Sequence, residues 1–306
     1  MGGRFDLVGF MGPIIQCVPN FSEGRDAAVI ESIVDAGRRA SAARVIDYSF
    51  DPDHNRAVVT FLGAPEDIRT AVFAAAGRAV ELIDMRVHTG AHPRIGAADV
   101  VPLVPVRGVT MRQCVALSYQ IGRDIAEGLH VPVYFYERSA VLYHRTNLAD
   151  IRRGGYENLA SIALEGERAP DIGPSSVHPT AGATVIGARG PLIAYNINLN
   201  SQDMEVARAI VSKIRSGEAN LEGVKSMSVW LAAKSRVQVS MNITNPDLTP
   251  LREVYRFVRD EARNYGVEVA ESEIIGAIPR CFLDGTSPHE LKAVQFKDSQ
   301  ILDNSL

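Results

Sequence analysis

Residues 43–62 read ARVIDYSFDPDHNRAVVTFL. Two apolar runs, 43–48 and 57–62, stand on either side of DPDHNR, a segment rich in residues that favour turns. Runs of this length with β-branched and aromatic residues are typical of β-strands. We therefore predict two consecutive strands joined by a polar turn.

Helix and strand patterns extend from this stretch in both directions. Segments with apolar residues at helical spacing alternate with short apolar runs, so we predict the order βαββαβ up to residue 104. The expected elements are a strand at 14–18, helices at 27–40 and 65–83, a strand at 99–104, a helix at 111–128 and a strand at 131–136.

The pattern starts again after residues 171–182, which are rich in Gly, Pro and Ser; we call them the connecting segment and expect a hinge there. Each amphipathic helix must bury its apolar stripe on a sheet. The predicted fold class is therefore α/β (α+β), with two α/β units whose mixed sheets are covered by helices. The elements expected beyond the segment are strands at 183–188, 192–198, 224–231, 236–242 and 267–270, and helices at 201–216 and 249–265.

The composition narrows the range of partners. The 306 residues include 32 Lys and Arg and 36 Asp and Glu, and the net charge of -4 favours neither nucleic acid nor a membrane surface. The three cysteines, Cys17, Cys114 and Cys281, are far apart and odd in number, so we expect neither a disulfide framework nor a CxxC site. The sequence contains no apolar run of membrane-spanning length and no signal-peptide pattern. We expect a cytoplasmic protein.

Two histidines stand out in residues 87–101, VHTGAHPRIGAADVV. Gly90 lies between His88 and His92, and Pro93 follows, so the segment is predicted to be a shaped loop and not a helix. A histidine on such a loop suits general acid–base catalysis. It could equally be structural, with its ring bonded to loop carbonyls.

A metal site at these histidines would need further ligands. Asp47, Asp99 and His54 are suitable residue types, but no spacing specifies them, so we predict no metal. A metal-dependent amidohydrolase stays open as an alternative that inhibition by a chelator would reveal.

Three further features could bind a ligand. Arg56 begins an apolar strand, so its guanidinium either reaches solvent or faces a carboxylate, which a substrate could supply. The connecting segment offers a flat ligand small residues, hydroxyls and N–H groups, although it could be a plain linker. Asn196 and Asn198 suit a hydrogen-bond network as well as a ligand contact.

Eight segments, in order along the chain, resemble the formiminotransferase domain family of glutamate formimidoyltransferases. The resemblance runs from about residue 14 to about residue 283. Position 49 departs from it, because Ser49 stands where some relatives carry a carboxylate. The segments are CVPNFSEG at 17–24, DYSFDPDHNR at 47–56, HTGAHPRIGA at 88–97, VPVY at 131–134, IRRGGYE at 151–157, PDIGP at 170–174, GATVIGAR at 182–189 and AYNINL at 194–199.

The resemblance implies transfer of a formimino group between N-formimidoyl-L-glutamate and the co-substrate tetrahydrofolate, in histidine degradation and one-carbon metabolism. It implies an N-terminal extension at 1–13 and two ferredoxin-like subdomains, at 14–182 and 183–306, in a homodimer with folate between the subdomains. The chain ends before a cyclodeaminase domain could begin, so we expect the stand-alone form. His92 is the implied catalytic residue. The implied folate-binding residues are Gly173, Pro174, Ser175, Ser176, Val177, His178, Pro179, Thr180, Ala181 and Gly182.

Amidine exchange requires one proton to leave the attacking amine and one to reach the departing amine. We expect His92 to perform both transfers, Asp47 to face the amidinium charge, and Arg56 and Arg94 to bind the glutamate carboxylates. Two alternatives stay open, namely formyl transfer from N-formylglutamate and a folate- or amino-acid-binding module without chemistry.

Overall fold

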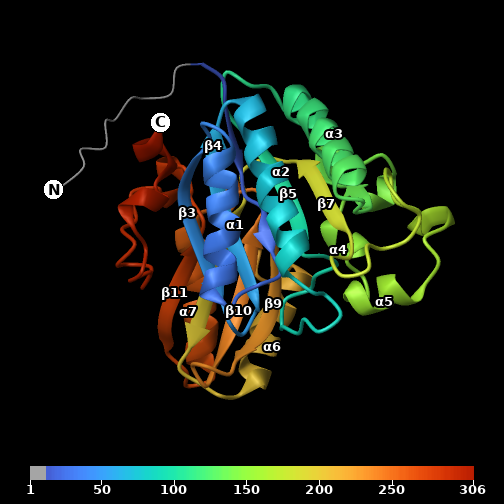
Figure 1. Cartoon of the computed structure of the whole chain (residues 1–306). Coiled ribbons are helices and arrows are strands. Elements are labelled where there is room, and N and C mark those ends of the chain that lie inside the picture. Colours follow the sequence, from blue (N-terminus) through green and yellow to red (C-terminus); the bar gives the residue numbers. More distant parts are fainter. Residues whose placement is uncertain (1–11) are drawn as a thin grey trace.

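The computed structural model describes residues 12–306 and confirms the predicted pair of strands (Figure 1). β3 (Arg44–Asp51) and β4 (Arg56–Gly63) pair in antiparallel orientation, with Asp51 opposite Arg56. Both strands run further into DPDHNR than predicted, so the turn consists of residues 52–55. Of the predicted extension at 1–13, residues 1–11 lie outside the described part of the chain.

Seven strands form the first sheet. β1 and β2 lie between β4 and β5 and are antiparallel to both, whereas β5, β7 and β6 run parallel to one another. The prediction of a mixed sheet is therefore confirmed for this half. Besides β3 and β4, the strands are β1 (Ile14–Cys17), β2 (Asn20–Phe21), β5 (Ala98–Arg107), β6 (Val133–Phe135) and β7 (Thr184–Ala188).

Three long helices cover one face of this sheet (Figure 1): α1 (Ala27–Ala40), α2 (Pro65–Leu82) and α3 (Met111–Gly128). Their sequence signals are conventional, since the Asp26 carboxylate caps α1 and Pro65 opens α2. On β4, Val59 and Phe61 lie in the core with the helices. Arg56 and Thr60 occupy the alternate positions and therefore lie on the opposite face.

The second sheet belongs to a complete βαββαβ unit with strand order β11-β8-β10-β9, the ferredoxin-like arrangement. Its pairs are all antiparallel, so the prediction of a mixed sheet is wrong for this half. Apolar residues of β8 pack with the helices, which leaves Asn196 and Asn198 on the other face. The elements are β8 (Ile193–Leu199), α6 (Met204–Ser216), β9 (Val224–Leu231), β10 (Arg236–Ile243), α7 (Leu251–Asn264) and β11 (Val269–Ile275).

The change from one sheet to the other comes between β7 and β8, not at the expected boundary between residues 182 and 183. β7 pairs with β5 and β6 and belongs to the first half. Parallel neighbours such as β6 and β7 need a long crossover, which here contains α4 (Leu148–Ile151), α5 (Gly155–Ser161) and the connecting segment. The connecting segment therefore lies within the first half and is not a hinge between the halves.

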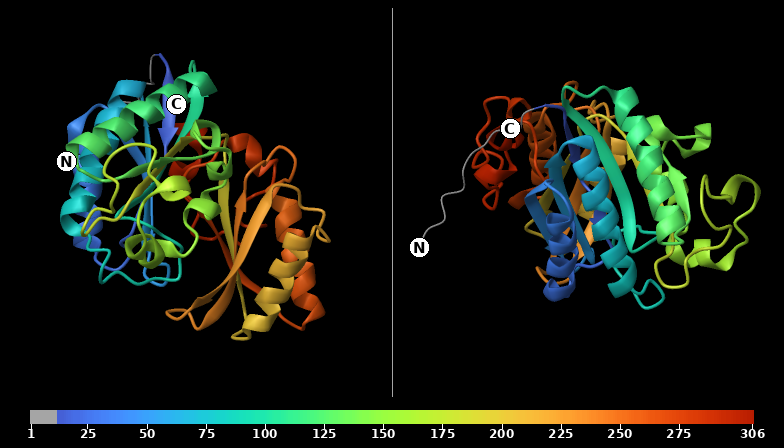
Figure 2. Two further views of the ribbon diagram at one scale, coloured as in Figure 1. Left: turned by 90° about the vertical axis from the view of Figure 1, so that its right-hand side faces the viewer. Right: turned by 45° about the horizontal axis from the view of Figure 1, so that its top comes forward.

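The second half and the C-terminal residues pack against the first half (Figure 2). Gln16 on β1 donates a side-chain hydrogen bond to the carbonyl of Ala277 at 2.9 Å. Ile14 and Leu62 form a small apolar cluster with Leu302 near the chain end. Among the helices of residues 12–306, none combines the length and apolar character that a membrane crossing needs.

Candidate active site

The loop that carries His92 is locked to the β3–β4 turn. Asn55, which has a left-handed backbone with φ of 50°, accepts a hydrogen bond from Gly24 N and donates one to the Thr89 carbonyl, at 2.9 and 2.8 Å. A Cβ on Gly90 would collide with the carbonyl oxygen of His54. The sequence therefore needs glycine at position 90 so that the loop can lie directly on the turn.

His92 lies in this loop with its ring against Arg56. Arg56 Nη1 is 2.6 Å from His92 Nε2, and because a guanidinium can only donate, the Nε2 lone pair accepts and the ring proton resides on Nδ1. Burial of the ring and the charges of Arg56 and Arg152 hold the His92 pKa well below its usual range. The imidazole is therefore neutral at physiological pH.

Arg56 and Arg152 place two half-buried positive charges beside His92. Arg152 forms an ion pair with Asp99, which also accepts a hydrogen bond from Ile95 N. Burial and the nearby Arg152 lower the Arg56 pKa to about 10. Arg56 donates to no carboxylate among residues 12–306, so the pair would gain from an anionic partner.

His88 is structural, as the second interpretation of the loop allowed. Its Nε2 lies 3.0 Å from the Asn55 carbonyl, and its Nδ1 accepts a hydrogen bond from Arg94 at 3.1 Å. Both ring nitrogens are thus occupied. Residues 12–306 contain no group of three His, Cys, Asp or Glu side chains placed to hold a metal ion.

Arg94 is already saturated by protein partners. Its guanidinium makes two hydrogen bonds to the Glu157 carboxylate, at 2.6 and 2.9 Å, and one to the His88 carbonyl. Only 11% of its side chain is exposed. The geometry therefore favours a structural role for Arg94, which holds the loop through His88 and Glu157, over the expected contact with a glutamate carboxylate.

Asp47 lies on β3, away from the β3–β4 turn. It pairs with Thr60, four positions along β3 from Asp51, which faces Arg56. At the rise of a strand, this places Asp47 roughly 13 Å from the turn. Burial raises its pKa, and Lys297 opposes that shift. The strand spacing therefore argues against the expected placement of Asp47 at the amidinium charge.

His54 joins the loop to the second sheet. Its ring centroid lies 6.1 Å from that of His92, and its Nε2 lies 3.1 Å from Gln238 Oε1 on β10. Gln238 donates to Asn198, whose amide donates to the carboxylates of Glu271 and Glu273. Asn198 is thus part of a hydrogen-bond network, and His92 lies close to the junction of the two halves.

The end of the connecting segment runs beside the His92 loop. Ala97 N donates to the Ala181 carbonyl and Ala183 N to the Ile95 carbonyl, at 2.9 and 3.0 Å. A Cβ on Gly182, where φ is +72°, would collide with the Ile95 oxygen. Earlier in the segment, Gly173, Ser175 and Ser176 are exposed. The predicted folate-binding and catalytic segments are therefore neighbours.

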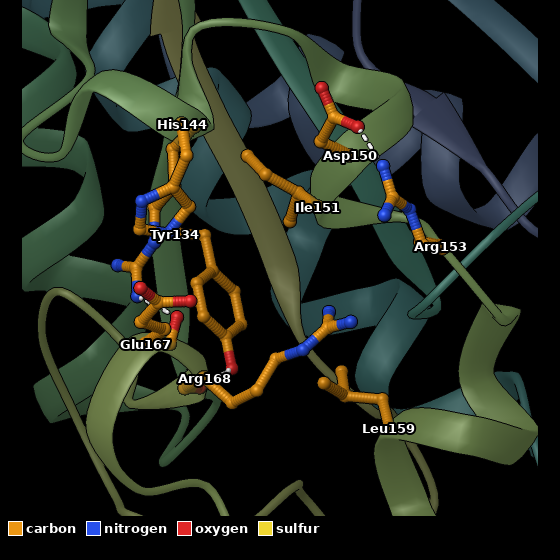
Figure 3. Close-up of a pocket in the computed structure, with 9 residues that line it drawn as sticks. Tyr134, His144, Asp150, Ile151, Arg153, Leu159, Glu167 and Arg168 are labelled. Atoms are coloured by element: carbon orange, nitrogen blue, oxygen red, sulfur yellow. Dashed lines mark hydrogen bonds and ion pairs between the residues drawn. The ribbon is translucent and has the colours of Figure 1, made fainter.

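A separate cavity of about 360 Å³ lies near the beginning of the connecting segment (Figure 3). Arg145 is paired with Asp171, and Arg153 with Asp150, so neither charge is free for an anion. The side chain of Arg168 extends into the cavity (Figure 3). His92 and Arg56 are absent from the lining, and the cavity is not part of the candidate active site.

Two family models match the chain. The N-terminal subdomain of the formiminotransferase domain matches residues 14–189, and the formiminotransferase domain matches residues 194–295. The chain belongs to the formiminotransferase domain family. The two matched regions meet between β7 and β8, where the structure changes from one sheet to the other.

Relatives in this family match the chain along most of its length. The glutamate formimidoyltransferase of Thermoplasma acidophilum is 42% identical over 96% of this chain and 97% of its own length. That of Streptococcus pyogenes is 39% identical over 97% of this chain and 99% of its own. The formimidoyltransferase-cyclodeaminase of Rattus norvegicus is 40% identical over 90% of this chain and 52% of its own length.

Two residues of the candidate site were not singled out from the sequence. Arg152 belongs to the segment IRRGGYE, but nothing in that segment indicates a guanidinium beside His92. Gln238 stands between Val237 and Val239 on β10, and a polar residue within an apolar run is a signal that could have found it.

Proposed function

We propose that this formiminotransferase domain protein is a glutamate formimidoyltransferase, which moves the formimino group between N-formimidoyl-L-glutamate and tetrahydrofolate in histidine degradation. The support is the match of about 40% identity, over nearly full length, to two enzymes that bear that name. The structural observation that carries the mechanism is the neutral imidazole of His92 beside the half-buried pair of Arg56 and Arg152.

His92 acts as base and then as acid. N5 of tetrahydrofolate attacks the formimidoyl carbon, which becomes tetrahedral, and the N5 proton passes to His92 Nε2. When the bond from that carbon to the glutamate nitrogen breaks, the imidazolium returns the proton to the departing nitrogen. The protein ends the cycle in the protonation state in which it began.

The position of Arg56 determines whether His92 Nε2 can accept a proton. Its Nη1 covers the same Nε2 lone pair, so a proton can be accepted only after the guanidinium moves. A glutamate carboxylate attracts it, because Arg56 is half-buried beside a second cation, Arg152. We therefore keep Arg56 as a substrate-binding residue. We do not keep Arg94, whose donors are taken by Glu157 and His88.

The connecting segment is the proposed folate site. Residues 173–182 include exposed hydroxyls and backbone, which can meet the donors and acceptors of a pterin. Its pairing with residues 95–97 supports folate binding next to His92.

A product assay tests the proposal. The protein is incubated with N-formimidoyl-L-glutamate and tetrahydrofolate, and both 5-formimidoyltetrahydrofolate and glutamate are measured. We expect the two products in equal amounts and no effect of a chelator. Glutamate released without the folate product would indicate a hydrolase, and binding without turnover would indicate a non-catalytic module.

The proposal includes a homodimer in the cytoplasm. The buried thiols of Cys17 and Cys114 are free in the structure, which is compatible with a reducing compartment. Sedimentation velocity tests the dimer, and a monomeric mass at micromolar concentration would contradict it.

A further inference from the structure

The hydrogen-bond network of the second sheet fixes the tautomer of His54. The carboxylates of Glu271 and Glu273 can only accept, so Asn198 presents its amide N–H groups to them. Asn198 Oδ1 then accepts from Gln238 Nε2 at 2.8 Å, which leaves Gln238 Oε1 to accept from His54. His54 therefore carries its proton on Nε2 and has a bare lone pair on Nδ1.

That lone pair is the unusual feature. His54 is 4% exposed, and its Nδ1 is buried without a hydrogen-bond partner in the protein. Buried acceptors are nearly always satisfied, and an exception calls for an explanation. The ring centroid lies 6.1 Å from that of His92, so this unpaired acceptor lies beside the proposed base.

We propose that His54 Nδ1 accepts a hydrogen bond from the imino N–H of the formimidoyl group and so makes the site select formimino over formyl donors. The inference rests on the proposed function. The imino nitrogen carries a proton whether the amidine is neutral or charged, whereas the oxygen of a formyl group can only accept. When N-formylglutamate binds, its formyl oxygen faces His54 Nδ1. Both atoms can only accept, so the His54 lone pair stays without a hydrogen bond.

The cost of an unpaired buried polar group corresponds to a preference of about tenfold to a hundredfold. This preference originates in the second half of the molecule. The carboxylates on β11 fix the donor and acceptor of each hydrogen bond through β8 and β10, and so fix the tautomer of His54. Gln238 is thus a positioning residue that acts through His54.

The experiment measures kcat/KM for N-formimidoyl-L-glutamate and for N-formyl-L-glutamate, each with tetrahydrofolate, and compares their ratio between variants. His54→Phe keeps a ring but removes the acceptor, and we expect the ratio to fall at least about tenfold. Gln238→Lys donates to His54 Nε2, which moves the ring proton to Nδ1. We expect Gln238→Lys to shift the ratio toward the formyl donor. This variant tests the inference independently if His54→Phe does not fold.

Asn242→Lys is the matched control, since Asn242 lies exposed on β10 at the same alternate positions as Gln238. We expect it to keep the wild-type ratio. Unchanged ratios in folded His54→Phe or Gln238→Lys would overturn the inference and leave the proposed function standing. Failure of the wild-type protein to use either donor would overturn the proposed function itself.

Discussion

At the candidate site, the role of each histidine depends on the hydrogen-bond partners of its two ring nitrogens. His88 and His92 are four residues apart in one loop, yet the first has both ring nitrogens bonded to protein and the second has a buried Nδ1 without a partner. Sequence reasoning identified His92 only through the family resemblance. It could not separate the two roles from the residues alone, because the partners Arg56 and Asn55 lie more than thirty positions earlier.

Replacing Arg56 by glutamine should change the pH dependence of the reaction. Arg56 is one of the charges that lower the His92 pKa, so its loss raises that pKa and moves the acidic limb of kcat/KM to higher pH. The KM for N-formimidoyl-L-glutamate should rise about tenfold or more, because a charged contact to its carboxylate is lost. Steady-state rates between pH 5 and 9 measure both effects.

Arg259→Gln serves as the control for that variant, because Arg259 is on α7 and pairs with its neighbour Asp260. It should leave both the acidic limb and the KM unchanged. If Arg56→Gln also leaves the acidic limb in place, Arg56 does not tune the base.

At the scale of elements, the sequence predicted the pair β3 and β4 and the non-helical loop, because periodicity, Gly and Pro are local signals. The sequence did not predict the sheet to which β7 belongs. We expected β7 to be the first strand of the second half, but it pairs with β5 in the first sheet. A short apolar run does not show which sheet it joins, since the choice depends on partners such as β5 that are far away in the chain.

Gly182 is expected to hold the connecting segment against the His92 loop. Its φ of +72° is left-handed, and a Cβ would collide with the Ile95 carbonyl, so Gly182→Ala forces the two segments apart. The free energy of unfolding should fall by roughly 1–3 kcal/mol, and kcat should fall because the loop shifts. Urea unfolding and the product assay measure the two losses.

Gly190→Ala is the comparison, because a Cβ there meets nothing within 4 Å and its φ is not left-handed. That variant should keep wild-type stability and activity. Equal behaviour of the two alanine variants would show that the contact between the segments is unimportant.

At the scale of the whole molecule, the pattern of helices and strands predicted two α/β halves, and the family resemblance implied a ferredoxin-like fold for each. In the structure, β7 and β6 extend the first sheet beyond a ferredoxin-like arrangement of β3, β4, β1 and β5. The polar faces of β8, β10 and β11 meet the turn of the first half through Gln238 and His54. No repeat between the halves is visible in the sequence, because the shared βαββαβ order fixes which positions are apolar but not their identity.

The buried histidines make the stability of the fold dependent on pH. Burial is the main cause that lowers the pKa of His54, His88 and His92 in the folded protein, whereas the unfolded chain titrates near 6.5. As the pH falls through 6.5, the unfolded chain therefore takes up protons first and the free energy of unfolding decreases. His92, whose pKa lies well below its usual range, contributes roughly 1 kcal/mol of this loss between pH 7.5 and 5.5, and His54 and His88 act in the same direction.

Urea unfolding at the two pH values checks this expectation. His92→Ala should lose part of the pH dependence, because one of the neutral histidines is gone, while His144→Ala, an exposed residue, should keep all of it. A wild-type protein that is more stable at pH 5.5 than at pH 7.5 would refute the expected effect.

The most direct test of the account is the turnover of His92→Ala in the formimino transfer assay, together with its affinity for tetrahydrofolate. We predict that kcat falls by about 10²- to 10⁴-fold, the contribution of one acid–base group, while tetrahydrofolate binds as it does to the wild-type protein. An enzyme that keeps its full kcat without this imidazole would contradict the role of His92 as base and acid.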